Sequence, residues 1–165
     1  MPGGKLHSPI WTPYALYGTV DYVYGWPAWD NHVGFSAAQS SLNAVENVLY
    51  IYYLVTIIRN GAQDLFKART FGEFLVGSKS NTVSGPGVAK AVLVLFASTV
   101  MTLSKSVLYW LNEYFSGFAN VGHNTAYRLI VLWMIPNGFW LVFPTYMVWI
   151  LGKEIVAHMD PTEGQ

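Results

Sequence analysis

The chain has 165 residues, of which 53% are hydrophobic, 16% aromatic and only 11% charged, and its formal net charge is zero. Soluble domains carry about 25% charged residues, so this composition predicts a membrane protein, and the length predicts a single domain over residues 1–165. The zero net charge gives no reason to expect a nucleic-acid partner. The absence of cysteine excludes a disulfide framework and a thiol nucleophile.

Four apolar segments follow one another along the chain, at residues 10–26, 37–58, 88–111 and 127–151. A helix needs about 20 apolar residues to cross the hydrocarbon core. The predicted fold is therefore all-α, a polytopic membrane protein built as a four-transmembrane-helix bundle. The first segment is short and contains Pro13, and its alternative interpretation is an amphipathic helix lying in the membrane interface.

The connection between the second and third segments is polar and basic, and it ends in a predicted flexible loop, residues 77–87. Four crossings would place this connection and both termini on one side of the membrane. That side would hold seven basic residues, against Arg128 and Lys105 on the other: Lys5, Arg59, Lys67, Arg69, Lys79, Lys90 and Lys153. The positive-inside rule then predicts that both termini are cytoplasmic.

Asp21 is the one charged residue of the first segment. A charged side chain at mid-membrane costs at least about 2.5–3.5 kcal/mol on insertion scales, so it needs a reason to be there. Tyr17 lies four residues before it and Tyr24 three after, so a phenol can reach the carboxylate. The alternative is a buried hydrogen-bond network that only holds helices together.

Glu46 is the corresponding charge of the second segment. A polar stripe runs along one face of the predicted helix with the spacing i, i+3, i+4, i+7: Asn43, Glu46, Asn47 and Tyr50. Two carboxyl groups in two helices suggest one shared polar site with Asp21. Lys105 of the third segment could supply the opposite charge, although a purely structural ion-pair network remains the alternative.

The last segment contains Asn137 three residues before Trp140, so the amide and the indole share a helical face. Lipid offers the amide no hydrogen-bond partner, and we expect this face to turn toward other helices or a cavity. The four histidines show no metal-binding spacing, so neither a metal nor a cofactor is expected.

These groups together suit one chemistry in an apolar cavity. Burial disfavours the charged form of a carboxyl, which makes it a proton donor, and aromatic faces attract a cation. A substrate double bond could be protonated, the carbocation sheltered, and a different proton removed. The same groups also suit the mere binding of an amphipathic amine or a sterol.

Two stretches resemble the last helices of the emopamil-binding protein family, whose shared unit is called the EXPERA domain: Pro136-Asn-Gly-Phe-Trp-Leu-Val-Phe-Pro144 and Ser106-Val-Leu-Tyr-Trp-Leu-Asn-Glu-Tyr114. The family includes sterol Δ8–Δ7 isomerases and sigma-2-receptor-like proteins. Glu46 resembles the glutamate of the family's second helix, and Asp21 falls where the isomerases carry a histidine and the sigma-2-like members an aspartate.

The resemblance implies that Glu46 manages protons while Asn137 and Trp140 orient the substrate and face a cationic centre. Two positions depart from the isomerases. Gly25 stands where they carry a glutamate, and Leu49 where a threonine is expected. These departures favour proton chemistry on another isoprenoid or polyketide-like substrate over sterol isomerisation.

We therefore expect a cofactor-independent isomerase or cyclase of the endoplasmic-reticulum membrane. Glu46 and Asp21 are its predicted proton-transfer groups, and the predicted substrate contacts are Asn137, Trp140, Tyr17, Tyr24, Asn43, Tyr50 and Lys105. Its partners would be a hydrophobic small molecule and the lipid bilayer, and a homodimer is left open. The alternatives are a non-catalytic sterol- or amine-binding protein and an accessory membrane subunit.

Overall fold

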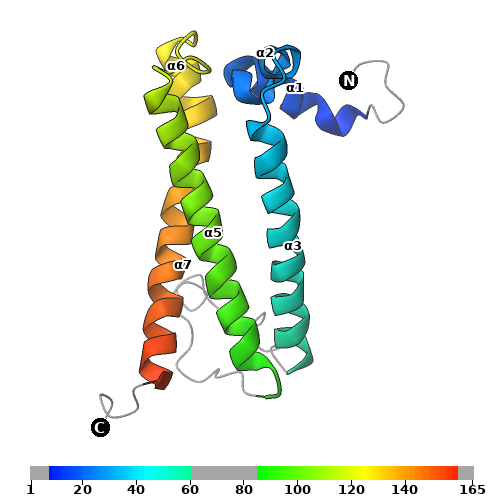
Figure 1. Cartoon of the computed structure of the whole chain (residues 1–165), viewed down its shortest axis with the longest axis vertical. Helices are drawn as coiled ribbons and strands as arrows, with labels where there is room; N and C mark the ends of the chain where they lie inside the picture. The colour runs from blue at the N-terminus through cyan, green and yellow to red at the C-terminus, as the bar shows by residue number, and fades with distance from the viewer. Residues whose placement is uncertain (1–7, 61–84, 160–165) are drawn as a thin grey trace. The chain divides into compact units, whose positions relative to one another are not determined.

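The computed structural model describes residues 8–60 and 85–159, and within these ranges all regular secondary structure is helical. Three long helical runs dominate it (Figure 1). They are α3 (Phe35–Arg59), α5 (Val88–Phe115) and a continuous run over residues 126–159. Each is long and apolar enough to cross a membrane. The structure thus agrees with three of the four predicted spans.

The predicted first span is not a single helix. It consists of four short pieces: η1 (Pro9–Trp11), α1 (Thr12–Val20), η2 (Tyr22–Tyr24) and α2 (Trp26–Asp30). α1 has nine residues, about 14 Å of helix, whereas the hydrocarbon core is about 30 Å thick. A four-helix membrane bundle is therefore not confirmed.

The chain breaks after α1 for local reasons. Asp21 has an extended backbone and its carboxylate accepts a hydrogen bond from the Val23 N–H at 2.9 Å, so it caps η2 instead of continuing α1. Gly25 then passes directly over Gly18, so close that a Cβ at position 25 would lie 2.2 Å from the Gly18 carbonyl oxygen. The short pieces therefore fold back on one another.

The last helical run changes its winding near the beginning. After α6 (Ala126–Arg128), η4 (Leu129–Met134) forms a π-helical turn, and α7 (Ile135–Met159) follows. Pro136 explains the position of this turn, because proline has no N–H for the carbonyl four residues earlier and its ring collides with that carbonyl. Wide turns of this kind are common at functional sites, and this one carries the buried Trp133.

The chain divides into two compact units. The first unit comprises Met1–Asn43 with Thr102–Pro144, and the second comprises Ala44–Met101 with Thr145–Gln165. The first has a buried core of Val20, Tyr109, Val121 and Trp133. The second has a smaller buried cluster in which Ile57 and Val88 pack with Tyr53 and Val92.

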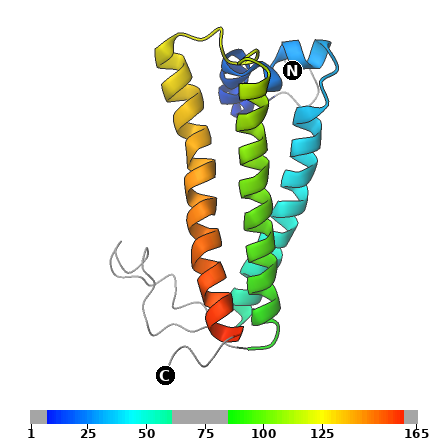
Figure 2. The same cartoon turned by 60° about the vertical axis from the view of Figure 1, so that its left-hand side comes forward.

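In the first unit, α1 and α2 lie at the end where α3 begins, and α1 runs crosswise to the first turns of α3 (Figures 1 and 2). Most of the predicted flexible loop over residues 77–87 lies outside the described residues, as do Lys5, Lys67, Arg69 and Lys79.

Candidate functional site

The centre of the site is the carboxylate of Asp21, which has no solvent-exposed surface. Three donors from three parts of the chain reach it. The Val23 N–H donates to Oδ1 at 2.9 Å, the Trp133 indole N–H to Oδ2 at 3.1 Å, and the Tyr109 hydroxyl also to Oδ2. A buried carboxylate is tolerated only when its oxygens accept hydrogen bonds in this way.

A chain of donors leads from the surface of the first unit to this carboxylate. The Asn137 amide donates to the Tyr17 hydroxyl at 2.9 Å, and the hydroxyls of Tyr17 and Tyr109 lie 3.4 Å apart. Tyr109 donates to Asp21, and its oxygen accepts the Trp133 indole N–H at 2.6 Å, which leaves its second lone pair for the Tyr17 hydroxyl. The donors therefore point inward, from the half-buried Asn137 through two phenols to Asp21.

Aromatic rings form the walls around this chain. Tyr17 and Tyr24 lie with ring centroids 5.6 Å apart, and Tyr24 and Tyr109 with centroids 6.0 Å apart. Trp133 packs against Tyr109 at 5.8 Å and against Trp110 at 4.5 Å. Such tilted ring pairs contribute about 0.5–1.5 kcal/mol each beyond their buried area.

The connection between α5 and α6, residues 116–125, holds the backbone around Asp21 from the other side. The Asn120 carbonyl accepts from the Tyr22 N–H at 3.1 Å, and the Asn124 amide donates to the Val20 carbonyl at 2.6 Å. His123 stacks on the Tyr22 ring with centroids 3.8 Å apart, and its Nε2 lies 2.9 Å from the Thr19 carbonyl oxygen. We call this connection the clamp.

Burial controls the electrostatics of the site. It raises the pKa of Asp21 to about 6, and the negative charge of Glu113 adds to the rise, while the Val23 N–H and the Trp133 indole oppose it. Burial also raises the pKa of Tyr17 to about 12 and raises that of Tyr24. At neutral pH both phenols therefore keep their protons, and Asp21 titrates near the pH at which a proton-transfer group works best.

Three of the predicted contacts join Asp21 in one cluster of the first unit, namely Tyr17, Tyr24 and Asn137. Asn43 and Lys105 form a separate pair there, in which the ammonium donates to the amide oxygen.

Trp140 is 61% exposed, and among the described residues it lies outside the hydrogen bonds and ring contacts of the cluster. Glu46 is buried and Tyr50 half-buried, both in the second unit. The shared site of Asp21 and Glu46 stays a prediction.

Sequence reasoning missed Tyr109, Trp133 and Glu113. Tyr109 and Trp133 are 88 and 112 residues from Asp21, and no local spacing links them to it. The sequence feature that could have pointed to Trp133 is its position four residues before Asn137, about one helical turn away. The Asn137 amide donates to the Trp133 carbonyl at 2.8 Å. Glu113 is fully buried, and its Oε1 accepts from Asn120 at 2.7 Å, so it supports the clamp.

The predicted resemblance, which stays a prediction, aligns Gly25 with a glutamate of the isomerases. The contact between position 25 and the Gly18 carbonyl leaves no room for any side chain. The glycine at position 25 is therefore explained by the way the chain folds back at η2. The carboxyl group that this turn places in the site is that of Asp21.

The fold and the site define an all-helical chain with three helices able to cross a membrane and a buried, hydrogen-bonded carboxylate among aromatic rings. Comparison with models of protein families, with curated proteins and with solved structures finds no significant match. Within the described residues, no three histidine or acidic side chains gather as metal ligands.

Proposed function

We propose that this protein is a membrane isomerase or cyclase that moves protons on an apolar, alkene-containing substrate without a redox cofactor. One observation carries the proposal: Asp21 is a fully buried carboxyl with a pKa of about 6, reached by a line of hydrogen-bond donors from the half-buried Asn137 and Tyr17. A titratable group so placed in an apolar, aromatic environment is typical of proton-transfer sites.

The proposed reaction balances without any further reactant. A proton adds to one carbon of a double bond and leaves a carbocation on the other carbon, which neighbouring aromatic faces stabilise. Loss of a proton from an adjacent carbon then forms the shifted double bond. In a cyclase, a second double bond attacks the carbocation before that loss.

Asp21 serves best as the final proton acceptor in this scheme. Because the donors point inward, Tyr17 can take up a proton from the substrate while passing its own to Tyr109, which passes its own to Asp21. Such contacts often tighten only when substrate binds, and the 3.4 Å between the two hydroxyls leaves room for this. Asn137 orients the Tyr17 hydroxyl through its 2.9 Å hydrogen bond.

Glu46 keeps the role of proton donor, and Trp140 that of cation stabiliser, which the resemblance to the emopamil-binding protein family implies. The same resemblance supports a location in the endoplasmic-reticulum membrane and a sterol-like, isoprenoid or polyketide-like substrate. A four-helix EXPERA-like arrangement would require residues 10–26 to cross the membrane.

The test is incubation of membranes containing the protein with a Δ8-sterol, and in parallel with linear isoprenoid alkenes, in deuterated water. Mass spectrometry of the extracted products should show an isomer carrying deuterium. Asp21→Asn should lower the rate about 100-fold or more, the usual contribution of a positioned acid or base. Asp30→Asn, which changes an exposed aspartate of α2, should leave the rate unchanged.

Full turnover by Asp21→Asn would overturn the assigned role. Glu46→Gln tests the proton donor separately, and loss of turnover there with normal binding would support it. If only the sterol fails to react, the substrate class changes and the mechanism stands.

A ligand-binding protein is the second candidate, and the carboxylate of Asp21 inside aromatic walls favours it, because such a site suits a cationic amine. A tertiary amphipathic amine should then bind to the wild type and to Asp30→Asn but not to Asp21→Asn. Recovery of every bound ligand chemically unaltered, with no turnover of any alkene, would favour binding over catalysis.

A further inference from the structure

Residues 9–30, which we call the N-terminal cap, present an apolar outer surface. Large side chains are exposed along it, including Ile10 at 74% and Trp29 at 66%, together with Tyr14, Leu16 and Trp26. The only charged residues of the cap are Asp21, which is buried, and Asp30 at its end. Water is a poor solvent for so many large apolar side chains exposed on one short segment.

The inner surface of the cap is fixed in place, so the outer surface is fixed as well. Val20, Asp21 and Val23 are buried, and the clamp holds Val20 and Tyr22 by the hydrogen bonds from Asn124 and to Asn120. The exposed face therefore cannot be hidden by a simple rotation of α1 or α2.

The cap is also too short and too broken to cross a bilayer. It lies at the end of the first unit where α3 begins, and α1 runs crosswise to the first turns of α3, as both views show (Figures 1 and 2). An element crosswise to a spanning helix lies along the membrane plane. The remaining position for an apolar element there is the boundary between headgroups and acyl chains.

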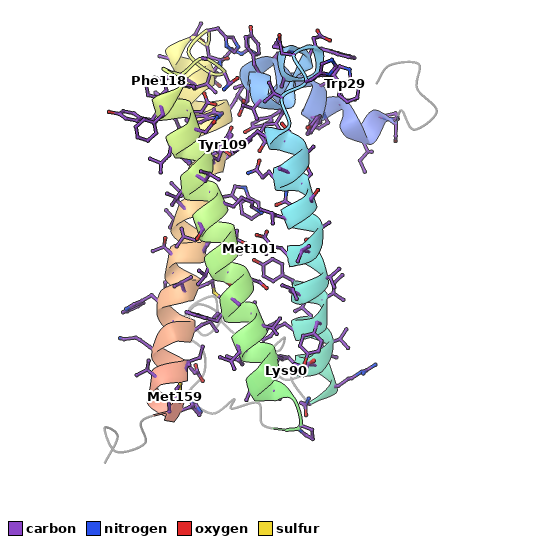
Figure 3. All side chains as sticks on the ribbon, in the orientation of Figure 1. Trp29, Lys90, Met101, Tyr109, Phe118 and Met159 are labelled. Carbon is purple, nitrogen blue, oxygen red and sulfur yellow. The ribbon has the colours of Figure 1, made fainter. Side chains whose placement is uncertain are left out.

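A second set of aromatic residues occupies the same end of the first unit. Tyr114, Phe115 and Phe118 are exposed at the end of α5 and in the clamp, and Tyr127 is exposed in α6. Figure 3 shows Phe118 and Trp29 at this end. Exposed tyrosine and tryptophan side chains gather where membrane proteins meet the headgroups.

We propose that the N-terminal cap lies in the phospholipid headgroup layer, with Trp26 and Trp29 as its anchors and with Asp21 on its buried inner side. The occupant of the outer surface is the same bilayer that α3, α5 and α7 cross. The first expected span thus becomes an interfacial element. The proposal does not depend on the chemistry at Asp21.

The test uses the absence of cysteine from the chain. Single-cysteine variants at Tyr14, Trp29, Leu108 and Asn31 are labelled with a nitroxide in phosphatidylcholine vesicles. Electron paramagnetic resonance then measures collisions with oxygen, which concentrates in acyl chains, and with a water-soluble nickel chelate. The ratio of the two collision rates gives the depth of each label.

Labels at positions 14 and 29 should lie at the interface, relaxed by both agents. Leu108 is exposed on α5, seven residues before Phe115, and its label should lie about 10 Å deeper, at about 1.5 Å per residue. The label at the exposed Asn31 should collide mainly with the nickel chelate. This pattern at two independent cap positions supports the proposal.

Three results would overturn it. A label at position 14 as deep as the label at 108 would mean that the first segment crosses the membrane. Labels at 14 and 29 relaxed only by the nickel chelate would mean that the cap faces water. Labels shielded from both agents, with spin–spin broadening that disappears on dilution with unlabelled protein, would mean that a second copy covers the surface.

Discussion

Asp21 affects both the local fold and the chemistry of the first unit. It caps η2 and accepts three hydrogen bonds, and burial raises its pKa to about 6. Its donors favour the charged form and its burial favours the neutral form, and burial has the larger effect. Burying this carboxyl costs stability, and the same burial tunes its pKa for proton transfer, a combination that is common at functional sites.

Asp21 should make the stability of the protein depend on pH. Because its pKa is higher in the folded state, its contribution to the free energy of unfolding is complete below about pH 4 and is lost as the pH rises through about 6. Denaturant titrations of wild type and Asp21→Asn should therefore diverge by at most about 3 kcal/mol across this range, at about 1.4 kcal/mol per pKa unit. Asp30→Asn should keep the wild-type slope, and an Asp21→Asn profile parallel to the wild type would contradict this.

The rate of turnover of any accepted alkene should also depend on the protonation of Asp21. It should rise with pH over the range in which the stability falls. An acceptor must be deprotonated, so the rate at saturating substrate should rise with pH through about 6 and level off above it. Tyr17→Phe should lower the rate by interrupting the donor chain, whereas Tyr14→Phe, a change at an exposed phenol, should not. A rate that falls as the pH rises through 6 would show that Asp21 acts in its protonated form.

Gly25→Ala should destabilise the first unit by about 1–3 kcal/mol, the usual cost of overpacking, because the new Cβ would lie 2.2 Å from the Gly18 carbonyl oxygen. Thermal unfolding in detergent measures this. Gly138→Ala is the matched control, since nothing lies within 4 Å of a Cβ there and alanine is favoured in helices by about 0.5–1 kcal/mol. Equal effects of the two changes would mean that the close crossing at Gly25 is not maintained.

At the scale of elements, the clamp and the π-helical turn act together on Asp21. The clamp holds the backbone on either side of it, while η4 brings the Trp133 indole to the carboxylate. Neither element carries an acid or base of the proposed reaction, so both act by positioning. Their loss should alter the environment of Asp21 as well as the stability.

Asn124→Ala tests this positioning. It removes donors to the Val20 and Val121 carbonyls, at 2.6 and 2.8 Å, and should cost about 1–3 kcal/mol because a buried carbonyl is left unpaired. It should also shift the midpoint of the pH–rate profile, which a purely global destabilisation would leave in place. Asn31→Ala, whose amide bonds the Pro27 carbonyl at an exposed position, should change stability by less than about 0.5 kcal/mol.

At the scale of the whole molecule, the three proposed crossings predict that residues 31 and 159 face opposite sides of the membrane. Single cysteines at Asn31 and Met159, probed with an impermeant maleimide on sealed vesicles, should react from opposite sides. Arg59, Lys90 and Lys153 flank one set of helix ends, so the positive-inside rule predicts that Met159 is cytoplasmic. Reaction of both cysteines from the same side would contradict three crossings and would support the predicted fourth crossing by the first apolar segment.

The sequence by itself determined the long helices and the class of protein, because uninterrupted apolar runs have few other stable states and can be recognised locally. It also singled out Asp21, Tyr17 and Asn137, since a charge or an amide in such a run needs a partner. The boundaries of α3 and α5 lie within a few residues of those predicted, for the same reason.

Tertiary structure alone decided what surrounds Asp21. Tyr109 and Trp133 reach the carboxylate from 88 and 112 residues away, and the clamp reaches its backbone from a similar distance. The break after α1 depends on the crossing of Gly18 and Gly25, which composition does not reveal. An apolar run predicts burial in lipid, but whether it crosses the bilayer or folds back depends on contacts between segments distant in the chain.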